Sequence, residues 1–66
     1  MIGPVVQLLR GMIDDSERDF HRIQNIIQSL PSNSHLRHTL RDVQHAELLR
    51  LNMLRTALTE VAESRA

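Results

Sequence analysis

The sequence predicts an all-α fold, a two-helix antiparallel hairpin that dimerises into a four-helix bundle. Three observations indicate this fold. Apolar residues recur at steps of three and four along two long segments, which is the period of one helix face. A single proline-containing break, "LPSNSH" at residues 30–35, separates the two segments. Each segment also carries more apolar side chains than one line of contact between two helices can bury.

The first segment predicts a helix over about residues 4–30. Gly3-Pro4 suits a helix start, because a proline in the first turn lacks an N–H that would have no helical partner there. Pro31 should end the helix near Leu30, since the residue before a proline disfavours the helical conformation. Ser16 interrupts the expected inward-facing line, whose apolar members are Val6, Leu9, Ile13, Phe20, Ile23, Ile27 and Leu30.

The second helix should cover about residues 35–64, after a turn at residues 31–34. Ser32, Asn33 or Ser34 can cap its N-terminus, and no Gly or Pro follows. Glu47 interrupts its inward-facing line, whose apolar members are Leu40, Val43, Leu51, Leu54, Leu58 and Val61. Because the connection is short, the two helices should be antiparallel neighbours, and residues 1–66 should form one helical hairpin.

Chain length favours self-association. A domain of 66 residues has little core of its own, and the absence of cysteine removes disulfides as a source of stability. A lone hairpin would leave much of both apolar stripes in water. We therefore expect the chain to be its own partner, as a homodimer with identical surfaces in contact, although packing on a different helical protein is the alternative.

Charge and composition narrow the function classes. Eight arginines, no lysine and eight acids give a formal net charge of zero, so binding to nucleic acid or an anionic membrane is not expected. The start "MIGPVVQLLRG" has neither a basic region nor a cleavage signal, and a cytoplasmic protein is expected. No nucleophilic triad or glycine-rich phosphate loop is recognisable, and we expect no enzyme activity.

Four residues are candidates for a polar layer at the middle of the bundle. A chain reversal near residue 33 brings position 16 opposite about position 50, and Glu47 opposite about Asp19 or Phe20. The candidates are Ser16, Asp19, Glu47 and Arg50. A buried carboxylate needs a partner, so Glu47 should contact Arg50 or Ser16 and fix the register, bind a metal ion, or be more exposed than the periodicity implies.

Two stretches carry a resemblance to a known family. "LLRGMIDDSERDF" (residues 8–20) and "LPSNSHLRHTLRDVQHAELLRL" (residues 30–51) resemble the helix pair of ferritin-like proteins of the rubrerythrin and spore-coat kind. The resemblance implies a di-iron or related centre, in which Asp42 and His45 take the place of the family's Glu-x-x-His pair and Ser16 stands where the family has a glutamate.

The metal question has two further parts. Glu47, which the periodicity turns inward, completes the candidate ligand set Asp42, His45 and Glu47 for iron or zinc. A second set of residues falls on the outer face of the second helix: His35, His38, Asp42 and His45. These side chains could bind a zinc or nickel ion, or they could simply form a solvated surface. No bound cofactor is the default expectation.

Three functions therefore remain open from the sequence. The favoured one is a non-catalytic oligomerisation or interaction module, with Leu48, Leu49 and Met53 as an additional patch for a helical partner. The second is a ferritin-like metal protein. The third is an RNA-binding hairpin dimer, which resembles a plasmid copy-control protein in architecture only and would use a basic face with Arg37 and Arg41.

Overall fold

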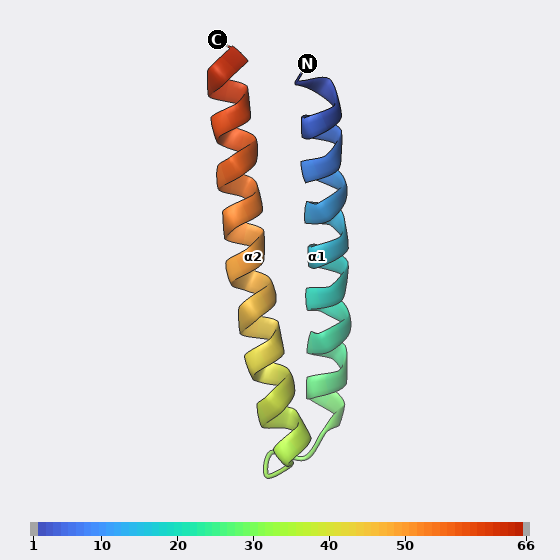
Figure 1. The fold of residues 1–66 in the computed structure, drawn as a ribbon. Coiled ribbons are helices and arrows are strands. Elements are labelled where there is room, and N and C mark those ends of the chain that lie inside the picture. The colour runs from blue at the N-terminus through green and yellow to red at the C-terminus, as the bar shows by residue number, and fades with distance from the viewer. Residues whose placement is uncertain (1, 66) are drawn as a thin grey trace.

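The computed structural model describes residues 2–65, and the side chains of residues 2–64, as two antiparallel helices. Helix α1 covers Gly3–Ser29 and helix α2 covers His35–Arg65. The two ends of the chain lie together at one end of a rod of 50 × 14 × 11 Å, and the loop lies at the other (Figure 1). The expected all-α hairpin is thus confirmed. Neither helix, over the described residues, is long and apolar enough to cross a membrane.

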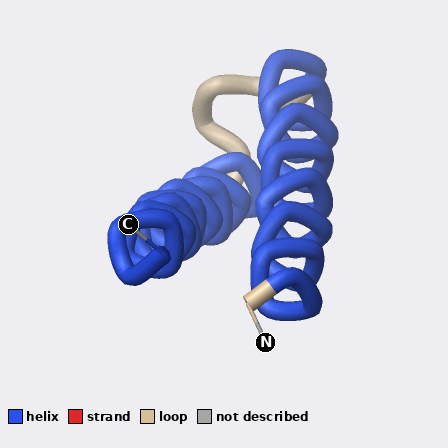
Figure 2. The backbone as a smooth tube through the Cα atoms, turned by 90° about the horizontal axis from the view of Figure 1, so that it is seen from above, coloured by secondary structure: helices blue, strands red, loops and turns tan. Residues whose placement is uncertain are grey.

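Short-range interactions define the turn between the helices. Leu30 adopts an extended conformation before Pro31, as a residue preceding proline prefers. The Ser34 Oγ accepts a hydrogen bond from the backbone N–H of Arg37 at 3.3 Å, so Ser34 is the residue that caps α2. The Arg37 guanidinium donates to the Leu30 carbonyl at 3.2 Å and ties the start of α2 to the end of α1. The helix axes are inclined to each other (Figure 2).

The helices meet along one line of contact, which we call the seam. Steps of three and four alternate strictly along it in both helices, as in coiled coils. In α2 this alternation runs through Leu40, Gln44 and Glu47, so the expectation that Val43 lies in the seam is wrong. Val43 is 43% exposed, and Gln44 takes its place because only position 44 keeps the alternation that continues through Leu51.

Few side chains in the seam are fully enclosed. Ile13, Leu51 and Leu54 form the buried cluster, against which Leu9 and Leu58 pack. Ile27 is buried nearer the loop. The remaining expected core residues are partly buried, and they are Val6, Phe20, Ile23, Leu30, Leu40 and Val61. The hairpin therefore has a narrow core along its length, with most of its surface open to solvent.

Candidate functional site

Two polar residues occupy seam positions near the middle of the rod. Counting the alternating steps from the Leu30–Arg37 contact puts Ser16 level with Leu51, and Glu47 level with Phe20. Ser16 is fully buried, and its Oγ has no hydrogen-bond partner among the described residues. The Oε2 atom of Glu47 is also buried without a partner in that part of the chain. The seam thus contains two uncompensated polar atoms, each of which opposes folding.

The four candidates for a central polar layer separate into two pairs. Ser16 and Glu47 lie in the seam, whereas Asp19 and Arg50 are exposed beside it. The Nη1 atom of Arg50 lies 4.0 Å from Oε1 of Glu47, which is a long ion pair with an exposed arginine. The alternative bond between Glu47 and Ser16 is not formed. A single hairpin therefore satisfies only one of the two Glu47 oxygens.

The candidate metal ligands do not converge. Asp42 is exposed on the outer side of α2, His45 is exposed on the polar side of the hairpin, and Glu47 points into the seam. No three His, Cys, Asp or Glu side chains in the described part of the chain are close enough to hold a metal ion together. The same holds for His35, His38, Asp42 and His45 on α2. A di-iron centre needs carboxylates that meet in the core, and the core position concerned holds Ser16, which is buried. These residues do not fit the centre that the resemblance implies.

One side of the hairpin, which we call the polar face, carries polar contacts between the helices. Glu17 and Arg55 pair across the helices at 3.5 Å. The Gln44 amide donates a hydrogen bond to the Gln24 carbonyl oxygen. In α1 the residues on this side directly follow seam positions 16 and 23, and in α2 they follow positions 40, 47 and 54. The contacts show that these positions share one side of the rod.

The residues that directly precede seam positions therefore share the opposite side. That side, which we call the apolar face, is rich in exposed apolar residues. Six large apolar side chains on it are between 43% and 73% exposed, and they are Val5, Leu8, Ile26, Leu36, Val43 and Met53. Met12, Ala46 and Ala57 extend the same face. Asp15, Asp19, Arg22 and Arg50 are the charged residues of this face near its middle. Exposed apolar side chains concentrated on one side are typical of an interaction surface.

The three leucine and methionine residues expected to form a partner patch are all exposed, but they do not share one surface. Met53 belongs to the apolar face, and Leu49, one turn earlier, borders it. Leu48 points to the polar face, where it lines a groove with Phe20. At about 100° per residue, Leu48 is roughly 140° from Met53 around the helix axis. One partner helix cannot contact all three.

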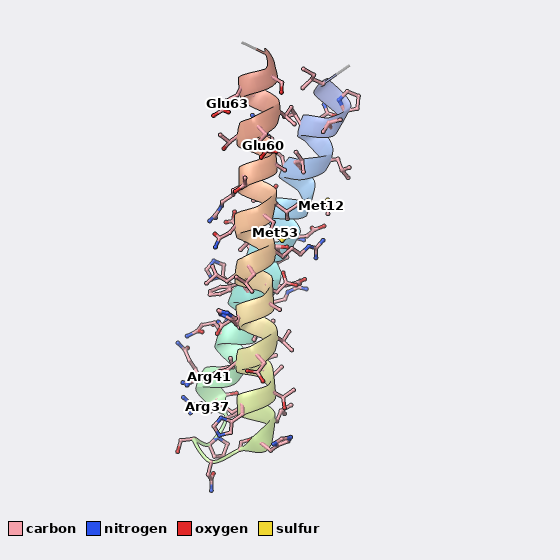
Figure 3. The ribbon with its side chains drawn as sticks, turned by 60° about the vertical axis from the view of Figure 1, so that its left-hand side comes forward. Met12, Arg37, Arg41, Met53, Glu60 and Glu63 are labelled. Carbon is pink, nitrogen blue, oxygen red and sulfur yellow. The ribbon has the colours of Figure 1, made fainter. Side chains whose placement is uncertain are left out.

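Charge is divided along the length of the rod. The segment from residue 20 to residue 46, which surrounds the loop, contains three arginines, all four histidines and one acid, Asp42. The rest of the chain contains seven acids and five arginines, and four of these acids lie in residues 14–19, near the middle of the rod. Arg37 and Arg41 lie near the loop and Glu60 and Glu63 near the chain ends, with Met12 and Met53 between them (Figure 3). The neutral total therefore conceals an excess of two positive charges around the loop, which two excess acids balance elsewhere along the rod.

A groove on the polar face near the loop was missed by sequence reasoning, and we call it the arginine groove. Arg37 and Arg41 line one wall from α2, and Gln24 and Gln28 line the other from α1. Its volume is about 390 Å³. The remaining lining residues are Phe20, Ile27, Gln44, His45 and Leu48. No carboxylate among the described residues lines it, so every formally charged group in its walls is cationic.

No protein-family model matches this chain, and no significant match was found among curated proteins or among solved structures. The candidate functional surfaces of this chain are thus the apolar face and the arginine groove.

Proposed function

We propose that this chain is a non-catalytic helical oligomerisation module that pairs with a second copy of itself to form a four-helix bundle. The observation that supports it is the apolar face, where six large apolar side chains are exposed on one side of a hairpin whose other side is polar. Burial of each such side chain contributes about 1.5–3 kcal/mol. A second hairpin that presents the same face covers all of them at once.

The available area is adequate for a stable dimer. A standard protein interface buries about 800 Å² per partner, roughly one sixth of the 4994 Å² that this hairpin exposes. One long side of a rod of 50 × 14 × 11 Å offers surface of that order. Two rods packed side by side also give the usual geometry of a four-helix bundle.

Charge on the apolar face favours a second copy over an unrelated helix. Asp19 and Arg50 are opposite charges near its middle that come from different helices of the same hairpin, and α1 adds Asp15 and Arg22 to this face. A face that carries both signs on an apolar background is self-complementary, because each copy offers an acid to the arginine of the other.

The proposal is tested by a pair of charge substitutions at adjacent positions. Met53→Asp places a carboxylate on the apolar face, whereas Asn52→Asp places one on an exposed position directed toward the polar side. Two copies of Met53 lose their burial in each dimer, so the dissociation constant should rise at least about 100-fold for Met53→Asp. Sedimentation velocity over a concentration series measures it, and Asn52→Asp should dissociate as the unsubstituted protein does.

Equal effects of the two substitutions would contradict the proposal, since the apolar face would then have no special role. A dimer that Met53→Asp leaves intact would do the same. Circular dichroism of both variants separates loss of association from loss of helix.

A further inference from the structure

The arginine groove lies on the side of the hairpin that the proposed dimer leaves free. Its walls bring together two arginines and a histidine from α2 with glutamine amides from both helices. Neither helix forms this site alone, because both contribute side chains to its walls. It is thus a candidate for binding a ligand, independent of the apolar face.

Arg37 is held in place before any ligand arrives. It is partly buried, and its guanidinium donates one hydrogen bond to the Leu30 carbonyl at 3.2 Å. A guanidinium has five N–H donors, so four stay available in a fixed orientation. A side chain that is already oriented loses less conformational entropy on binding than a free arginine does.

Spacing along α2 matches an extended anion. Arg37, Arg41 and His45 succeed each other at steps of four residues, so each lies about 6 Å further along the axis than the one before. This is close to the spacing of consecutive phosphates along a nucleic-acid strand. Arginine binds phosphate oxygens through paired N–H donors, which makes two such residues in line a suitable phosphate grip.

The remaining lining has the groups that bind nucleobases. Gln24 and Gln44 are hydrogen-bonded to each other, which leaves N–H donors on Gln24 and an acceptor oxygen on Gln44. Gln28 adds an amide on the exposed edge of the groove. Phe20 and Leu48 supply apolar contact at the floor. Amides beside an apolar floor recognise the edge and the face of a base.

We propose that the arginine groove binds the phosphate of a nucleotide, with the attached base against the glutamine amides. The expectation that nucleic acid is an unlikely partner rested on the neutral total charge, whereas residues 20–46, around the loop, carry an excess of two positive charges. Asp42, the one acid near the groove, lies on the exposed outer side of α2 and not in the lining.

The test measures binding of a fluorescein-labelled single-stranded oligoribonucleotide by anisotropy at about 50 mM salt, with adenosine monophosphate and inorganic phosphate as unlabelled competitors. Arg41→Gln should weaken binding about eightfold and should lower the slope of log affinity against log salt by about 0.7, the values expected for one lost phosphate contact. Arg41 is exposed, so the substitution leaves the seam intact.

Arg10→Gln is the matched control. It removes the same charge from an exposed position of α1 near the chain ends, far from the groove. Its affinity and salt slope should equal those of the unsubstituted protein. If adenosine monophosphate competes at concentrations where inorganic phosphate has no effect, a free nucleotide is sufficient for binding. If neither competes, the ligand is a nucleic-acid strand.

Three results would overturn the proposal. The first is an oligoribonucleotide that does not bind at about 50 mM salt, where a phosphate contact is strong. The second is an equal loss of affinity in Arg41→Gln and Arg10→Gln, which would indicate diffuse charge attraction. The third is equally tight binding of a poly-glutamate peptide, which would make the groove a site for acidic protein segments.

Discussion

Two polar residues in the seam lower the free energy of unfolding of the hairpin. Ser16 is fully buried with an unpartnered hydroxyl, and Glu47 has one oxygen in the same state. A buried polar atom without a partner costs about 1–3 kcal/mol. In a molecule with so few enclosed apolar side chains, two such atoms are a large fraction of the balance. Ser16 and Glu47 therefore lower the stability of the hairpin.

Replacing Glu47 by leucine should therefore stabilise the protein. Leucine removes the unpartnered Oε2 atom and packs against Phe20, which is level with it in the seam, so the free energy of unfolding should rise by about 1–3 kcal/mol. Urea denaturation at one fixed protein concentration measures this change, because the proposed self-association would make stability depend on concentration.

Two further substitutions serve as comparisons for Glu47→Leu. Ser16→Ala should raise the free energy of unfolding by about 1 kcal/mol, since it removes the other unpartnered atom without changing the packing much. Glu63→Leu, at an exposed site, should leave it unchanged. If Glu47→Leu lowered stability while Glu63→Leu did not, Glu47 would have a partner that the hairpin alone does not supply.

The two helices are the elements that the sequence predicts best. Gly3-Pro4 and Pro31 constrain the backbone locally, and the observed helices Gly3–Ser29 and His35–Arg65 lie within one residue of the expected 4–30 and 35–64. The choice of Gln44 over Val43 was harder to predict. Both positions continue a helical stripe, and hydropathy favours valine, but only Gln44 keeps the alternation along the whole seam.

The turn offers a prediction for the element scale. Ser34→Ala removes the hydroxyl that accepts the Arg37 backbone N–H at 3.3 Å, so the free energy of unfolding should fall by about 1 kcal/mol. Thermal denaturation followed by circular dichroism measures the change, with Ser32→Ala, an exposed turn residue, as the control. Equal loss in both variants would show that Ser34 does not act as the cap.

The arginine groove marks the limit of prediction from sequence. The line of Arg37, Arg41 and His45 on one helix face is visible in the sequence, and so is its proximity to Asp42. The glutamines of α1 that complete the groove lie at least nine residues earlier in the chain, and their contribution depends on the register between the helices. The charge total also gave no sign of the groove, because acids elsewhere along the rod balance the arginines of residues 20–46.

At the scale of the whole molecule, the hairpin separates its surfaces by side and by end. Exposed apolar side chains occupy one long side, and polar contacts between the helices occupy the other. A rod with one apolar side leaves that side in water unless a second molecule covers it. The arrangement supports the proposed pairing through the apolar face, which would leave the arginine groove accessible in the pair.

Native mass spectrometry of the unsubstituted protein over a range of concentrations tests the central claim of self-association most directly. The account predicts a dimer, with twice the chain mass of 7.6 kDa, that persists to low micromolar concentration. Adding Fe(II) or Zn(II) in the same experiment should leave the mass unchanged, because Asp42, His45 and Glu47 do not converge. A folded monomer at every concentration would contradict the account.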